Sequence, residues 1–264
     1  MKLNLKGNIS RDFDKVADSY DEHAIIQRKA AQHLFSLTRS HIKSDSVVLD
    51  AGCGTGYFHE LLRKHKIYCP LFQTDISYNM CKKSDDYSSP PEYGGTYTFL
   101  SDIESLPFGS DSLDMFFSSL TVQWTDIAKV LGQAFTTLKP NGKLAIATIG
   151  HDTLFELKRS SQQLERPLYI NDNFIDEDKL RGLCIKAGFK DVQVSVQSIK
   201  AEHINIKQLL TSIKGVGASY KADRDGKYLG RDYFNKLEDS YRKNFSSENK
   251  LIASWNIIYA TATK

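Results

Sequence analysis

The sequence lacks the features that mark several large classes of protein. Its 264 residues include only four cysteines, and no apolar run approaches the ~20 residues needed to cross a bilayer. The cysteines show neither paired spacing nor a neighbouring histidine cluster, which predicts reduced thiols rather than disulfides or zinc ligands. The first residues lack the apolar core of a signal peptide. We therefore expect a cytoplasmic protein without a membrane partner or a bound metal.

An excess of charge of one sign is also nearly absent. The formal charge of +3 is too small, by itself, to indicate nucleic-acid binding. The basic excess lies late in the chain, where residues 207–243 hold nine basic and five acidic side chains. A solvated surface is the simpler interpretation of scattered charges, and an acidic partner is the alternative.

What the sequence does contain is a regular alternation of strand and helix patterns. Five short apolar runs are typical of buried strands: 47–49, 67–73, 97–100, 113–118 and 143–149. Helical patterns lie between them, at 56–65, after Ser77 and at 127–138. This alternation predicts a parallel sheet covered by helices on both faces. Helical spacing also covers 10–40 and 176–187, where Gly188 is placed as a C-terminal cap. Period-two alternation at 191–200 and 254–263 predicts two late antiparallel strands.

The most informative segment is a glycine-rich loop after the first strand. Val47–Leu49 leads into Asp50-Ala51-Gly52-Cys53-Gly54-Thr55-Gly56, and a helix follows. A loop between a parallel strand and a helix N-terminus commonly holds a nucleotide-like ligand. The spacing differs from the Gly-x-Gly-x-x-Gly of dinucleotide sites, which disfavours a nicotinamide dehydrogenase. Asp50 would repel a phosphate but suits a cationic ligand.

Two further acids follow the next two strands. Because the carboxyl ends of parallel strands converge on one crevice, Asp75 and Asp102 should lie near Asp50. Asp75 is placed to accept hydrogen bonds from both hydroxyls of an adenosine ribose. Asp102 is placed to accept one from the adenine amino group while Ile103 packs on the ring. A loop cap would explain any one of these acids, but three together predict a ligand site.

The loop resembles the first motif of class I S-adenosylmethionine-dependent methyltransferases, and Phe13-Asp14-x-x-Ala17-x-x-Tyr20-Asp21 resembles their lid helix. The resemblance implies a doubly wound, Rossmann-like, seven-stranded and mostly parallel sheet with an antiparallel last strand. It implies one domain over 1–264, with lid helices at about 8–40, a cofactor core at about 41–150 and a helical cap insertion at about 203–247. S-adenosylmethionine would be held by Asp50, Ala51, Gly52, Cys53, Gly54, Gly56, Asp75, Ile76, Met80, Asp102, Ile103, Ser119, Tyr20 and Arg28.

Four further segments resemble the malonyl-acyl-carrier-protein O-methyltransferases of biotin synthesis. They are 102–108, Val122-Gln123-Trp124, Glu165-Arg166-Pro167 and 210–218. The resemblance implies methylation of the free carboxylate of a malonyl thioester, carried by acyl carrier protein or coenzyme A, and the basic 207–243 segment would then meet the acidic carrier. Family members often carry an Asn-Arg-Phe sequence where this chain has Asn171-Asp172-Asn173-Phe174. The acceptor would be bound by Gln123, Trp124, Arg166 and Lys214, a solvated charge being the alternative for the last two.

The sequence shows no Ser-His-Asp order and no pair of catalytic glutamates. Methyl transfer to a carboxylate needs neither, because positioning supplies most of the rate and a water-poor pocket favours the loss of charge. Tyr20 and Trp124 are the candidate catalytic residues, with burial in the core as the alternative for Trp124. Two other functions stay open: a small-molecule C- or O-methyltransferase of quinone or other metabolism, in which a phenol acceptor would require a base, and a non-catalytic cofactor-binding accessory protein.

Overall fold

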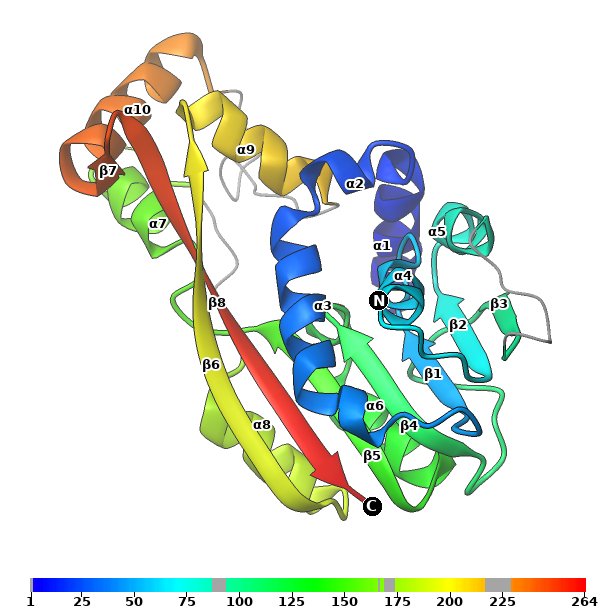
Figure 1. Ribbon diagram of the computed structural model, residues 1–264. Helices are drawn as coiled ribbons and strands as arrows, with labels where there is room; N and C mark the ends of the chain where they lie inside the picture. Colours follow the sequence, from blue (N-terminus) through cyan, green and yellow to red (C-terminus); the bar gives the residue numbers. More distant parts are fainter. Residues whose placement is uncertain (1, 87–93, 166, 169–173, 217–228) are drawn as a thin grey trace.

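The computed structural model describes residues 2–86, 94–165, 167–168, 174–216 and 229–264 (Figure 1). In these ranges the strands form one sheet in the order β3-β2-β1-β4-β5-β8-β6, with β7 paired to β8. The five parallel strands are β1 (Val48–Ala51), β2 (Leu71–Asp75), β3 (Thr96–Leu100), β4 (Leu113–Ser119) and β5 (Leu138–Ile149).

The last part of the sheet is antiparallel. β8 (Lys250–Thr263) lies between β5 and β6 (Lys190–His203) and runs opposite to both, while the short β7 (Ser246–Ser247) pairs with its first residues. The predicted fold class, a doubly wound and mostly parallel sheet with an antiparallel last strand, is confirmed. The two-residue β7, which was not predicted, makes the count eight rather than seven.

Two hydrophobic cores cover the opposite faces of the sheet. Because side chains alternate along a strand, Phe117 of β4 enters one core and Phe116 the other. The first core is closed by α3 (Ile25–Thr38) and α4 (Tyr57–Lys64), and the second by α6 (Ile127–Thr137) and α8 (Glu177–Lys186). β1 and most of β4 are buried on both faces, which explains why they appear in the sequence as continuous apolar runs.

The N-terminal helical pattern is divided into several pieces. α1 (Lys2–Val16), α2 (Tyr20–His23) and α3 are followed by the 3₁₀ turn η1 (Arg39–His41). α5 (Tyr78–Asp85) begins at Ser77, whose side chain accepts a hydrogen bond from the Met80 amide, and η3 (Val122–Trp124) follows β4. The predicted cap at Gly188 has φ +107°, a conformation that favours glycine.

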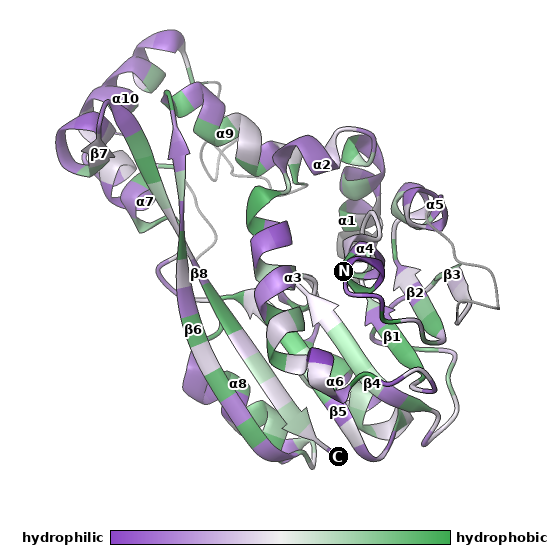
Figure 2. Cartoon of the chain, viewed as in Figure 1, coloured by the Kyte–Doolittle hydropathy of each residue, from purple (hydrophilic) through white to green (hydrophobic). Residues whose placement is uncertain are grey.

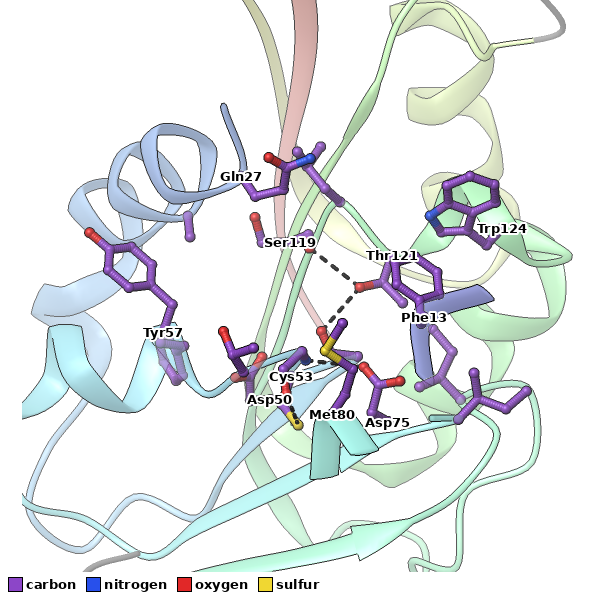
Figure 3. Close-up of a pocket in the computed structure, with 18 of the residues that line it drawn as sticks. Phe13, Gln27, Asp50, Cys53, Tyr57, Asp75, Met80, Ser119, Thr121 and Trp124 are labelled. Atoms are coloured by element: carbon purple, nitrogen blue, oxygen red, sulfur yellow. Dashed lines mark hydrogen bonds between the residues drawn. The ribbon is translucent and has the colours of Figure 1, made fainter. Parts of the chain in front are cut away.

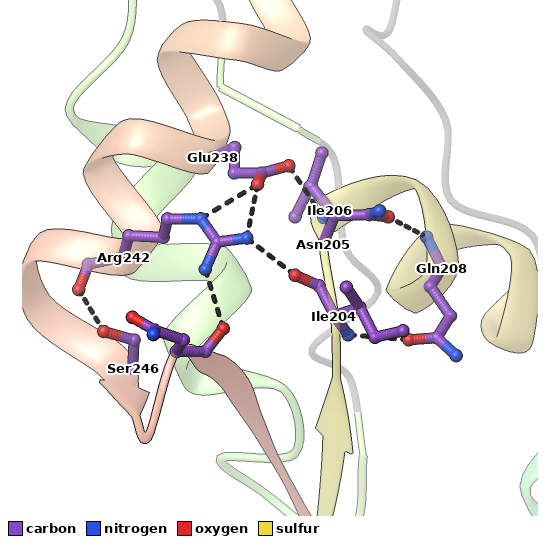
Figure 4. Close-up of polar contacts among 8 residues, drawn as sticks. Ile204, Asn205, Ile206, Gln208, Glu238, Arg242 and Ser246 are labelled. Carbon is purple, nitrogen blue, oxygen red and sulfur yellow. Dashed lines mark hydrogen bonds and ion pairs between the residues drawn. The ribbon is translucent and has the colours of Figure 1, made fainter.

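The long strands β6 and β8 carry a group of helices at their far end, made of α7 (Phe155–Gln162), α9 (Ile206–Gly215) and α10 (Arg231–Phe245) (Figure 1). Arg242 of α10 fixes this group, since its guanidinium donates to the carbonyls of Ile204 (2.6 Å) and Asn249 (2.9 Å) and to Glu238 (Figure 4). Glu238 in turn accepts from the Ile206 amide at 3.1 Å. The remaining surface of α10 is mostly hydrophilic (Figure 2). Among the described residues, no helix has the length and apolar character needed to span a bilayer.

Candidate active site

A cavity lies at the carboxyl ends of β1 to β4, beneath α1, α2 and α3 (Figure 3). Its empty volume is about 1020 Å³, including the open space at its mouth. Thirteen of the residues predicted to bind cofactor or acceptor line it: Tyr20, Arg28, Asp50, Gly52, Cys53, Gly54, Asp75, Ile76, Met80, Asp102, Ile103, Ser119 and Trp124. Residues at the ends of four strands, β1 to β4, thus lie together with residues of the N-terminal helices.

Other predicted site residues lie elsewhere. Ala51 is fully buried within β1, and Gly56 precedes α4 with φ +88°. Gln123 lines a second hollow beside Phe174 and Lys179, and Lys214 is exposed in the last turn of α9. Arg166 lies outside the described residues. The roles suggested for these five residues stay predictions.

The glycine loop is held in place by its neighbouring strands. The amides of Gly52 and Cys53 both donate to the Thr74 carbonyl, at 2.8 and 2.9 Å, and the Gly54 amide donates to Asp75 Oδ2 at 3.0 Å. Gly52 has φ +80°, and a Cβ there would lie 2.2 Å from Thr121 Cγ2. The loop therefore needs glycine at position 52 for both its conformation and its close approach to Thr121, in the segment between β4 and η3.

Two carboxylates, the buried Asp50 and the half-buried Asp75, favour a cation in the cavity. Asp50 is only 3% exposed, and burial together with the negative charge of Asp75 raises its pKa to about 8, although the nearby Gln73 side chain opposes the shift. Burial also raises the pKa of Asp75, against the stabilising amides of Ser77 and Gly54. Because desolvation penalises both charged forms, a bound cation would lower the electrostatic free energy of this region.

α1 closes the cavity through one row of polar side chains spaced four residues apart. Lys6 contacts Asp102 and lies 2.9 Å from Glu104, Ser10 donates to the Ile76 carbonyl at 3.0 Å, and Asp14 accepts from Ser77 Oγ at 2.6 Å. The same spacing places Ile9 and Phe13 toward the cavity, where the Phe13 ring meets the edge of Trp124 at 5.7 Å between centroids. Trp124 is half-buried against the lid rather than enclosed in the core.

We predict that Asp14→Ala weakens cofactor binding about fivefold and leaves turnover at saturating cofactor nearly unchanged. Asp14 also accepts from the Asn79 amide at 3.0 Å, so its loss removes two hydrogen bonds that dock α1 on the β2–α5 junction. Isothermal titration with S-adenosylhomocysteine measures the effect. Asp12→Ala is the matched control, because exposed Asp12 forms its ion pair, among the described residues, with exposed Lys15 on the same helix. Equal affinities for the two variants would contradict a role for this docking contact.

α2 and α3 complete the wall above the glycine loop. Thr55 of the loop donates to Asp21 at 2.8 Å, and Asp21 lies 3.4 Å from the Arg28 guanidinium, which also covers the Tyr57 ring. The Nε of Arg28 is buried and has no hydrogen-bond partner among the described residues. Burial and the nearby Asp75 raise the pKa of the Tyr20 hydroxyl, so this group remains a protonated donor.

These groups fit the chemistry of S-adenosylmethionine. The two carboxylates suit its cationic and hydroxyl groups, and the unpaired Arg28 Nε suits a carboxylate. Lys6, Gln27 and Tyr57 also line the cavity, although sequence reasoning did not select them. Gln27 and Arg28 belong to a stripe with Ala24 and Ala31 at helical three- and four-residue spacing, and this stripe is the signal that could have identified Gln27.

Comparisons with known proteins point to the same chemistry. Residues 49–146 match the model of the methyltransferase domain family. The malonyl-[acyl-carrier protein] O-methyltransferase 2 of Ilyobacter polytropus is 33% identical over 257 residues, which is 96% of each chain. The malonyl-[acyl-carrier protein] O-methyltransferase of Methylovorus sp. is 28% identical and covers 98% of this chain and 89% of its own.

Solved structures share the fold at lower identity. The YcgJ protein of Bacillus subtilis has a TM-score of 0.61 and 13% identity, covering 88% of this chain and 98% of its own. Phosphoethanolamine N-methyltransferase 2 of Haemonchus contortus, solved with S-adenosyl-L-methionine, has a TM-score of 0.56 and 18% identity, covering 95% and 57%. At such identities the likeness is one of fold.

Proposed function

Because the chain belongs to the family of malonyl-[acyl-carrier protein] O-methyltransferases, we propose that it methylates the free carboxylate of a malonyl thioester at the start of pimeloyl and biotin synthesis. It is a methyltransferase, and its cofactor is S-adenosylmethionine. The observation that carries the proposal is the 33% identity to the Ilyobacter polytropus protein, which extends over 96% of both chains and so includes the lid and the C-terminal helices as well as the cofactor core.

The side chains around the cavity suit a carboxylate acceptor. When bound, the cofactor supplies an electrophilic methyl group on a sulfonium. The protein's own residues would position the reactants and exclude water. Phe13 and Trp124 close one side of the cavity, and the contacts of Lys6 and Asp14 hold α1 over it. A carboxylate nucleophile is already ionised at neutral pH, so no residue has to remove a proton from it. Tyr20, as a protonated donor, is suited to orientation rather than to general-base catalysis.

Acyl carrier protein is the proposed carrier of the malonyl group, and coenzyme A is the alternative. The names of the relatives specify the carrier protein. The described part of α9 adds a local argument, since its charged residues Lys207 and Lys214 are both basic and exposed. A basic surface would increase the association rate with an acidic carrier.

The test is mass spectrometry of malonyl-acyl carrier protein and of malonyl-coenzyme A after incubation with the enzyme and S-adenosylmethionine. We expect one added methyl group on the malonyl unit, with a higher kcat/KM for the carrier-protein substrate. Acetyl-acyl carrier protein is the control, because it presents the same carrier without a free carboxylate. If neither malonyl substrate gains a methyl group, the proposed function is wrong.

A further inference from the structure

One polar side chain of the cavity is not used by the interactions described above. Gln27, in the first turn of α3, lines the cavity, and its Oε1 is buried without a hydrogen-bond partner among the described residues. The Ser119 hydroxyl at the end of β4 is in the same condition. Figure 3 shows the Gln27 amide above Ser119, across the cavity from Asp50 and Asp75. Because both residues line the cavity, a ligand bound there can supply the missing hydrogen bonds.

The charged groups of the cavity show which part of a ligand this is. Among the described lining residues the cations are Lys6 and Arg28, and both already contact acids: Lys6 contacts Asp102 and Glu104, and Arg28 contacts Asp21. The acids Asp50 and Asp75 lie on the opposite side and favour a cation there. Gln27 and Ser119 therefore form a wall of the cavity whose hydrogen-bonding groups are uncharged.

We propose that the Gln27 amide and the Ser119 hydroxyl together bind the carboxylate of the methyl acceptor, so that Ser119 contacts the acceptor instead of the cofactor contact expected from the sequence. This assignment rests on the proposed function, because it takes the acceptor to be a carboxylate. The terminal amide of Gln27 presents NH₂ donors after a half-turn about its last bond, and the Ser119 hydroxyl donates as well.

Neutral donors have a kinetic advantage over an ion pair at this position. The carboxylate loses its negative charge as its oxygen bonds to the methyl carbon. A paired arginine or lysine would therefore stabilise the starting carboxylate more than the transition state, which raises the barrier. A neutral hydrogen bond orients the carboxylate oxygen and raises the barrier less than an ion pair would. Gln27 and Ser119 would thus orient the carboxylate without greatly reducing its nucleophilicity.

The experiment compares Gln27→Leu and Gln27→Glu with the wild-type enzyme. We expect Gln27→Leu to raise the acceptor KM about tenfold or more, since a hydrogen bond to a charged group is lost. Gln27→Glu should raise it further, because two carboxylates would face each other. The Kd for S-adenosylhomocysteine should stay within about threefold in both, because the proposal assigns Gln27 to the acceptor and not to the cofactor. Gln162→Glu, at an exposed position of α7, is the control for the effect of adding one negative charge.

Three results would overturn the proposal: an unchanged acceptor KM in Gln27→Leu and Gln27→Glu, a cofactor Kd weakened as much as the acceptor KM, or a lower acceptor KM in Gln27→Glu. The second result would make Gln27 a cofactor contact. Ser119→Ala provides a second variant if substitutions at Gln27 reduce folding, and it should also raise the acceptor KM with the cofactor Kd retained. Failure of the wild-type enzyme to methylate any malonyl thioester is a separate result, which would refute the proposed function instead.

Discussion

Gly52→Ala is expected to weaken S-adenosylhomocysteine binding at least about a hundredfold, because positive-φ strain and overpacking together cost ~3 kcal/mol. Gly52 has φ +80°, and its new Cβ would lie 2.2 Å from Thr121 Cγ2 and 2.3 Å from Thr121 Oγ1. Thr121 cannot simply rotate away, because its hydroxyl donates to the Gly52 carbonyl at 3.2 Å. The loop would have to move away from Thr121, and isothermal titration measures the resulting loss of affinity.

Two further variants separate this explanation from a general loss of folding. Gly132 is an exposed residue of α6 with open space where a Cβ would lie, so Gly132→Ala should keep full affinity. The double variant Gly52→Ala/Thr121→Gly removes the clashing side chain and should recover part of the binding, although the backbone strain remains. If Gly52→Ala alone binds within about fivefold of the wild type, the loop does not require the close approach described here.

The order of strands and helices could be predicted because burial patterns the sequence directly. Leu49 and Phe116 lie on strands covered on both faces, so their neighbours are also apolar and the strands appear as continuous runs. The start of α1 could not be predicted in this way. Its first turns are mostly polar, and the contacts of Lys6 and Ser10 that hold them come from loops distant in sequence.

The same distinction applies to the candidate site. Asp50, Asp75 and Asp102 could be placed because strand ends converge in any doubly wound sheet. Gln27 could not, because its position depends on how α3 packs over that edge. Asp102 also illustrates the limit, since its predicted partner was a ligand amino group while the structure adds Lys6 beside it. Topology locates the acids, and tertiary packing decides what else reaches them.

Asp50→Asn is expected to stabilise the cofactor-free protein while it weakens cofactor binding at least about a hundredfold through the loss of a buried charge pair. The pKa of Asp50 is raised to about 8 in the folded protein from an ordinary value of 3.8. Its charge therefore destabilises the fold: the penalty is absent below pH 3.8, grows as the pH rises and is complete above about pH 8. The gain in Tm from asparagine should accordingly be larger at pH 8 than at pH 5, by about 2–4 °C for each kcal/mol removed.

Cofactor affinity should rise with pH over the same range in which the charge of Asp50 increasingly destabilises the fold. A cationic ligand takes the ionised carboxylate, so a proton on Asp50 competes with it. The wild-type affinity for S-adenosylhomocysteine, which carries an ammonium group, should rise as the pH increases toward about 8, whereas the affinity of Asp50→Asn should change little. Titrations at three pH values and thermal melts of both proteins measure the two trends, with exposed Asp12→Asn as the control. A lower Tm for Asp50→Asn at every pH would contradict this expectation. It would mean that the favourable influence of the Gln73 side chain on the carboxylate outweighs the burial penalty, so that Asp50 stabilises the fold.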